Sequence, residues 1–188
     1  MSSEKFGTKF QVSGYGGLTY TKHLIMEFFP SKIERFVEQF GGLGRITYLV
    51  KADEYFINDK SEYAYGYLKN KFPDYTVEQM DYMDFIKKYT TPNSFVFCDP
   101  PWRKNIYKNH ERPSFTEKNV ISYYDKFLEL LPTLECKWMI TSDRDEHENG
   151  HRLQKSEYKN ITMERGGTGK FFGRSPAVRL CSNIWEKD

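Results

Sequence analysis

The sequence lacks the features of a membrane-spanning, secreted or disulfide-bonded protein. No run approaches the roughly 18 apolar residues of a membrane span, and the first residues, Met1–Lys5, contain no apolar signal core. Cysteine is scarce: Cys98, Cys136 and Cys181 lie far apart inside apolar runs. This pattern indicates buried thiols in a reducing compartment rather than disulfides or metal ligands. We therefore expect a cytoplasmic protein with no metal site and no membrane contact.

The sequence also has little excess charge, no internal repeat and no linker. Lysine and arginine number 28 against 26 acids, a net charge of +2, so any basic surface for nucleic acid must be local. Aromatic residues make up 17% of the chain, and they can serve both core packing and base stacking. With 188 residues, the simplest organisation is one domain spanning 1–188, with a flexible start at 1–13.

The stretch from Phe95 to Trp102 joins an apolar strand to an acid, two prolines and an aromatic. Strand-forming residues bounded by proline indicate a buried strand, so Asp99 lies at its carboxyl end, where open α/β sheets bind ligands. Pro100 and Pro101 stiffen the turn and leave carbonyl groups as acceptors. Together with the flat ring of Trp102, these acceptors suit a planar base that carries an exocyclic amine.

Strands and helices alternate along most of the chain, which predicts a parallel sheet with helices on both faces. The expected strands are 35–40, 55–57, 75–79, 95–98, 136–141, 160–164 and 177–185. The expected helices are 18–29, 43–51, 61–71, 81–89, 117–131 and a short one at 145–155. The late strands follow one another without a long helix, which predicts an antiparallel hairpin at the sheet's edge.

A glycine-rich turn, Gly41-Gly42-Leu43-Gly44, follows the strand that contains Glu38. Such a turn between a strand and a helix start brings backbone N–H groups close to a cofactor, although it matches the dinucleotide pattern G-x-G-x-x-G poorly. Asp59 ends the next strand, and an acid at this distance commonly holds ribose hydroxyls.

Two motifs resemble those of a known family. Asp99-Pro100-Pro101-Trp102 resembles the D-P-P-Y/F/W motif of amino-methyltransferases, and residues 36–44 are similar to F-V-E-P-F-x-G-x-G of Dam-like adenine-N6 DNA methyltransferases, with Gln39 in place of proline. The motif order agrees over most of the chain. The resemblance implies a Rossmann-like fold with a mostly parallel seven-stranded sheet, S-adenosylmethionine (SAM) as cofactor, and methyl transfer to N6 of adenine in DNA.

The same resemblance implies a set of SAM-binding residues. Glu38 and the backbone of Phe40, Gly41, Gly42 and Gly44 would hold the methionine end, and Asp59 the ribose, with Ser61 where the family has asparagine. Asp81 and Tyr82 would lie beside the adenine of SAM, with Asp84 and Phe85 as the alternative pair. Tyr15 and Gly17 match the first motif in part, because Leu18 occupies its lysine position.

The target base would be held by Asp99, Pro100, Pro101 and Trp102. A basic segment directly after this turn, Arg103, Lys104, Lys108 and Arg112, is a candidate phosphate contact. Lys170 and Arg174, near a glycine-rich hairpin, are further candidates; the hairpin does not match a P-loop.

The chain lacks the target-recognition insert that Dam-like enzymes carry before the third strand. We therefore hypothesise weak sequence specificity, action on single-stranded or structured targets, or specificity supplied by a protein partner. Alternatives are an adenine-N6 methyltransferase acting on RNA, a methyltransferase for a small molecule or a protein amide, and a non-catalytic nucleic-acid-binding or partner subunit with a degenerate methyltransferase fold. Cytosine-N4 enzymes usually carry serine at the position of Asp99, which disfavours cytosine as the target.

Overall fold

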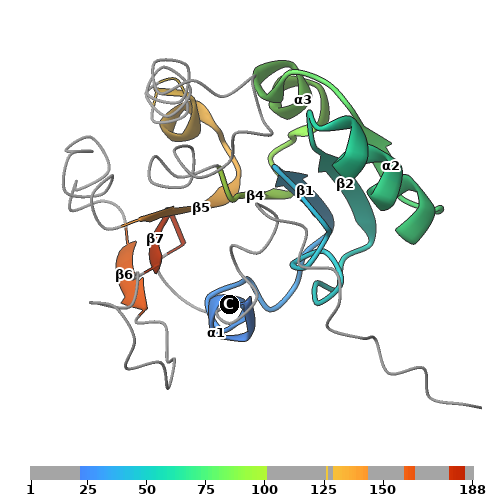
Figure 1. Ribbon diagram of the computed structural model, residues 1–188. Coiled ribbons are helices and arrows are strands. Elements are labelled where there is room, and N and C mark those ends of the chain that lie inside the picture. The colour runs from blue at the N-terminus through green and yellow to red at the C-terminus, as the bar shows by residue number, and fades with distance from the viewer. Residues whose placement is uncertain (1–21, 101–125, 127–128, 144–158, 164–177, 185–188) are drawn as a thin grey trace, which may run out of the picture.

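The computed structural model describes residues 22–100, 126, 129–143, 159–163 and 178–184 (Figure 1). The helices are α1 (Lys22–Met26), α2 (Glu62–Lys71), α3 (Tyr82–Tyr89) and the 3-10 helix η1 (Leu131–Thr133). The strands are β1 (Arg35–Gln39), β2 (Glu54–Asn58), β3 (Thr76–Glu78), β4 (Ser94–Cys98), β5 (Lys137–Asp143), β6 (Lys159–Met163) and β7 (Val178–Ser182).

The strands form one seven-stranded sheet in the order β3-β2-β1-β4-β5-β7-β6. The first five strands of this order pair in parallel, and β7 pairs antiparallel with both β5 and β6. The mostly parallel sheet with a C-terminal antiparallel hairpin is therefore confirmed. The chain moves outward from β1 to β3 and then returns to β4 on the other side of β1, so the strand order reverses between β1 and β4.

One face of the sheet is covered by α1 and α2. Ile25 and Phe29 pack against alternate strand residues of β1 and β4, including Phe36 and Phe95; the Phe29 and Phe95 rings meet edge to face at 4.7 Å. On α2, a narrow stripe centred on Leu68 packs against β2 and β3 in a smaller cluster. Apolar burial of this kind contributes about 25 cal/mol per Å².

The opposite face is covered by α3 and η1 (Figure 1). Phe85 and Ile86 of α3 pack against Val37 and Val96, the strand residues that alternate with those facing α1. Trp138 of β5, among the largest fully buried side chains, belongs to this cluster. Helices on both faces are therefore confirmed. Within the described ranges, every helix is too short or too polar to cross a bilayer.

The predicted helices at 61–71 and 81–89 are present, and each begins at a capping side chain. Ser61 Oγ accepts from the N–H of Ala64, and an Asp81 oxygen accepts from the N–H of Met83. Such N-caps satisfy backbone donors that would otherwise lack partners. Residues 126, 129 and 130 are helical and η1 follows, containing Pro132; the rest of the predicted helix 117–131, the helix 145–155 and residues 1–13 lie outside the described residues.

The predicted helix at 43–51 is wrong. The segment 42–49 forms consecutive turns, because its backbone hydrogen bonds mix three- and four-residue spacings. Gly42 and Gly44 have φ of 54° and 65°, outside the helical region. The Thr47 hydroxyl donates to Glu38 of β1, which ties this segment to the sheet. Local apolar spacing suggested a helix, but the glycine conformations and this tertiary contact prevent one.

Two glycines should respond oppositely to alanine. Gly44 has φ of +65°, and a Cβ there would lie 2.4 Å from Cε2 of Phe72, whereas a Cβ on Gly66 of α2 would have nothing within 4 Å. We expect Gly44→Ala to lower the free energy of unfolding by about 2 kcal/mol or more and Gly66→Ala to raise it by about 0.5–1 kcal/mol. Urea unfolding measures both, and a destabilising Gly66→Ala would contradict the open surface seen on α2.

Candidate functional site

The candidate site lies at the carboxyl ends of β1, β2, β4 and β5, where the strand order reverses. Open α/β sheets bind ligands in the crevice at such a reversal point. Asp99 directly follows β4, and its backbone N–H donates to the carbonyl of Gln39 at the end of β1 (3.4 Å). Pro100 is buried next to it. The acid that the sequence placed at a strand end therefore lies at the reversal point of the sheet.

The Asp99 carboxylate is held by the neighbouring strand. Thr141 of β5 is fully buried, and its hydroxyl donates a hydrogen bond to Asp99 Oδ1. Asp99 itself is only partly buried. An acceptor oriented by a buried donor, and still reached by solvent, is suited to receive N–H groups from a ligand.

The glycine-rich turn packs closely against the end of β2. The Gly41 N–H donates to the Asn58 carbonyl (2.9 Å), and a Cβ on Gly41 would lie 2.5 Å from Cγ2 of Ile57. Phe40 has φ of 63°, an uncommon conformation for a residue with a side chain. Strained backbone of this kind is concentrated at binding and active sites.

Asp59 joins the glycine-rich turn to the start of α2. Its Oδ2 accepts from the Gly42 N–H and its Oδ1 from the Ser61 N–H, both at 2.9 Å. A carboxylate offers about four acceptor positions, so these bonds orient Asp59 and are compatible with its predicted contact to ribose hydroxyls. Ser61, which stands where Dam-like enzymes have asparagine, is the N-cap of α2.

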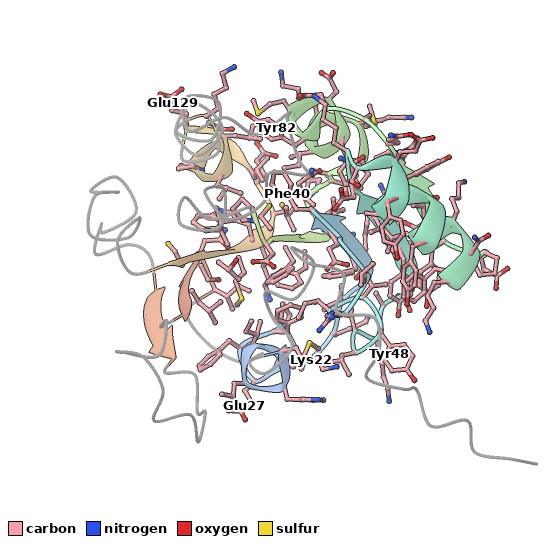
Figure 2. All side chains as sticks on the ribbon, viewed as in Figure 1. Lys22, Glu27, Phe40, Tyr48, Tyr82 and Glu129 are labelled. Carbon is pink, nitrogen blue, oxygen red and sulfur yellow. The ribbon has the colours of Figure 1, made fainter. Side chains whose placement is uncertain are left out.

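Tyr82 and Phe40 lie together between the end of β1 and α3 (Figure 2). Their rings are stacked at 6.1 Å with an interplanar angle of 28°. Asp81 caps α3 through its side chain. Of the alternative pair, Asp84 is exposed and Phe85 is fully buried in the core. The arrangement therefore favours Asp81 and Tyr82 over Asp84 and Phe85 as part of the site.

Glu38 is a buried carboxyl group on the α1 side of β1. The Thr47 hydroxyl donates to its Oε2. Burial raises the pKa of Glu38 from 4.5 to about 8; the Thr47 hydrogen bond opposes this, while the negative charges of Asp99 and Asp59 add to it. Three carboxyl groups thus interact at one edge of the sheet. A cation at this edge would be attracted to them and would lower the pKa of Glu38.

The raised pKa of Glu38 predicts a pH-dependent stability. Between pH 4.5 and about 8, the folded chain keeps a proton that the unfolded chain has lost. The contribution of Glu38 to stability is therefore greatest below pH 4.5 and is lost as the pH rises through that window, by up to about 1.4 kcal/mol per pH unit. We expect Glu38→Gln, which has no proton to lose, to show a flatter profile. Urea unfolding across the window measures the difference; parallel profiles would contradict the prediction.

Four residues that the sequence reasoning did not select also shape the site: Gln39, Thr47, Asn58 and Thr141. Asn58 is fully buried; its Nδ2 donates to Gln39 Oε1 (3.1 Å) and to the Met80 carbonyl (3.0 Å), and its Oδ1 accepts from the Met80 N–H (3.0 Å). Gln39, which stands where Dam-like enzymes have proline, thus has a specific buried partner in Asn58. The signal for Asn58 was its place beside Asp59 at the end of the strand.

The three cysteines are buried and free, as predicted. Burial raises the pKa of Cys136 to about 11 and of Cys181 to about 12, and it raises the pKa of Cys98 well above its usual value. These groups are therefore neutral thiols near pH 7. Within the described residues, no group of three or more histidine, cysteine and acidic side chains is arranged to hold a metal ion.

Several predicted site residues lie outside the described residues: Tyr15, Gly17, Pro101, Trp102, Arg103, Lys104, Lys108, Arg112, Lys170 and Arg174. The described part of the site consists of the remaining predicted residues, all at the carboxyl edge of the sheet or in the turns that follow it.

Comparison with solved structures identifies the fold. A putative methyltransferase from Streptococcus mutans in complex with SAH superposes with a TM-score of 0.57 at 14% identity, covering 89% of this chain and 97% of that one. An rRNA methylase from Streptococcus thermophilus gives a TM-score of 0.55 at 10% identity, covering 87% and 94%. The chain has the Rossmann-like methyltransferase fold.

The 23S rRNA methyltransferase ErmE is also similar, with a TM-score of 0.54 at 11% identity over 88% of this chain and 67% of that one. No protein-family model and no curated protein sequence matches the chain. The similarity is therefore one of three-dimensional structure, and it covers nearly the whole chain.

Proposed function

We propose that this chain is a SAM-dependent methyltransferase that acts on the exocyclic N6 amine of adenine in nucleic acid. The observation that carries the proposal is the position of Asp99: the acid of the Asp-Pro-Pro-Trp motif lies at the reversal point of a methyltransferase-fold sheet, oriented by Thr141. Its backbone N–H bonds to the end of β1, next to the glycine-rich turn, and its negative charge acts on Glu38.

The chemistry of these residues fits SAM. Glu38, Asp59 and Asp99 form an acidic, acceptor-rich edge, and SAM carries a sulfonium, an ammonium and two ribose hydroxyls. We assign the ribose to Asp59, the methionine end to Glu38 and the glycine-rich turn, and the adenine of SAM to the region of Tyr82 and Phe40. When bound, SAM supplies an electrophilic methyl group on a sulfonium centre. A structural neighbour crystallised with SAH supports SAM as the cofactor.

Asp99 and the Pro100 carbonyl would orient the target amine. Each accepts one N–H of the amino group, which directs the nitrogen lone pair out of the plane of the base. Orientation of this kind lowers the barrier because the reacting atoms are held in line before reaction. Trp102 would stack on the base, which must leave its own stack to reach the site. No metal ion or enzyme nucleophile is required for this displacement.

DNA is the first candidate substrate, because the motif order resembles that of Dam-like DNA methyltransferases. RNA is the second, and it is favoured by two structural neighbours whose names describe them as rRNA methyltransferases. The test is transfer of labelled methyl from SAM to duplex DNA, single-stranded DNA and RNA in parallel, followed by digestion to nucleosides. We expect label in N6-methyladenine on one polymer. SAM binding without label on any of the three polymers would overturn the assignment to nucleic acid.

A further inference from the structure

The outward side of α2 exposes an unusual amount of aromatic surface. Tyr63 is 53% exposed and Tyr67 37%, and Tyr48, in the turn segment beside the helix, is 69% exposed. Among the described residues, Leu24 on α1 is the one other exposed large apolar side chain. α2 buries only Ala64 and Leu68. Core packing therefore does not account for the tyrosines on this side.

These side chains follow one another along a single face. Tyr63, Tyr67 and Lys71 are spaced by four residues, so they share a face and rise by about 6 Å from one to the next. Lys71 Nζ lies 5.6 Å from the centre of the Tyr48 ring, which extends the row beyond the end of the helix. Gly66 lies to one side of the tyrosines on the helical wheel, and a Cβ there would meet nothing within 4 Å. We call Tyr48, Tyr63, Gly66, Tyr67 and Lys71 the α2 face.

The charge of the α2 face suits a polyanion. Glu62 is the one acid within α2, and on the helical wheel both it and Lys69 fall outside the arc from Gly66 to Lys71, so Lys71 is the charged residue of α2 on this face. Exposed flat rings spaced along a row with neighbouring cations are the features by which proteins bind single-stranded nucleic acid, since bases stack on the rings and phosphates meet the cations. A duplex keeps its bases stacked inside and cannot use the rings in this way.

The α2 face leads to the candidate site. The N-cap Ser61 donates its N–H to Asp59 at the carboxyl edge of the sheet, so Tyr63, in the first turn of α2, lies near the rim of the site. Lys71 lies at the other end of the helix. A single strand of nucleic acid that lies along this row of side chains would therefore pass from the rim of the site across the side of the molecule.

We propose that the α2 face is a docking surface for single-stranded nucleic acid, with bases stacked on Tyr48, Tyr63 and Tyr67 and a phosphate near Lys71. The proposal deepens the function proposed above, on which it rests for its biological role. It supplies strand binding for a chain that has no target-recognition insert. Binding by stacking depends little on base identity, so the α2 face would contribute affinity rather than sequence choice.

The test uses the full chain and fluorescence anisotropy of fluorescein-labelled oligothymidylate, oligouridylate and a duplex. We expect both single strands to bind more tightly than the duplex, and Tyr63→Ala/Tyr67→Ala to weaken single-strand binding at least about tenfold. Tyr63→Phe/Tyr67→Phe keeps the rings and should bind as wild type. Leu24→Ala, which removes an exposed apolar side chain elsewhere, is the matched control and should change nothing. Circular dichroism and SAM calorimetry verify that each variant is folded.

Unchanged single-strand binding by the folded double-alanine variant would overturn the proposal, as would equal losses in the alanine and phenylalanine variants. The double-alanine variant could instead lose binding to phosphatidylglycerol vesicles while its binding to the oligonucleotides is unchanged. That result would assign the α2 face to a membrane surface and would also overturn the proposal. Tyrosine-dependent strand binding without methyl transfer would support the α2 face and count against the proposed reaction. Methyl transfer that is unchanged in the tyrosine variants would support the proposed reaction and count against the α2 face.

Discussion

Replacing Asp99 by alanine is expected to lower methyl transfer at least about a hundredfold, because a single positioned group at the reacting centre is typically worth 10²–10⁴-fold. Alanine removes the acceptor that orients the target amine and leaves the Thr141 hydroxyl without this partner. SAM binding should persist, because Asp59 and the glycine-rich turn keep their contacts with one another. Labelled-methyl transfer measures the rate, and calorimetry measures SAM affinity.

Four further variants make the Asp99 result specific. Asp99→Asn keeps the shape but replaces one acceptor oxygen by a donor, so its loss should approach that of alanine. Asp84→Ala removes an exposed carboxylate from the first turn of α3 and should leave the rate unchanged. Thr141→Val frees Asp99 to rotate and should produce an intermediate loss, which Thr141→Ser recovers. An Asp99→Ala enzyme that keeps a tenth or more of the activity would rule out the proposed role.

Asn58→Leu is expected to lower the free energy of unfolding by about 3 kcal/mol or more, because each buried polar group left without a partner costs about 1–3 kcal/mol. Three such groups lose their partner: Gln39 Oε1, the Met80 carbonyl and the Met80 N–H. SAM affinity should fall as well, because Asn58 holds the end of β1 against the connection that leads to Tyr82. Urea unfolding and SAM calorimetry measure the two effects.

Control variants separate the effect of losing the Asn58 hydrogen bonds from the effect of replacing any asparagine by leucine. Asn93→Leu removes an exposed side chain whose Nδ2 also donates a hydrogen bond, to Glu34, and should cost less than about 0.5 kcal/mol. Asn58→Asp keeps an acceptor for the Met80 N–H but turns an oxygen toward two other acceptors, so it should be nearly as damaging as leucine. If Asn58→Leu has the same free energy of unfolding as wild type, the bonds of Asn58 to Gln39 and Met80 do not stabilise the fold.

Much of the sheet was predictable because its signals are local. The run from Phe95 to Cys98 is continuously apolar and forms the fully buried strand β4, and Asp81 begins a helix because its side chain caps the backbone N–H groups that follow. The segment 43–51 shows the opposite case. Its apolar spacing resembles a helix, yet Gly42 and Gly44 adopt left-handed conformations. Their conformations depend on the Gly42 bond to Asp59 and on the packing of Gly44 against Leu68 and Phe72, which no short window of sequence contains.

The sequence alone determined the alternation of strands and helices, the acids at the strand ends and the motif order, because each depends on neighbouring residues. The tertiary structure decided which of those ends meet. Asp99 comes close enough to Glu38 to act on its charge because the chain returns from β3 to pair β4 beside β1. The raised pKa of Glu38 and the hydrogen bonds of the buried Asn58 to Gln39 and Met80 also depend on how the sheet is assembled. A buried carboxyl or amide depends on partners that are distant in sequence, and only the folded sheet brings them within hydrogen-bonding distance.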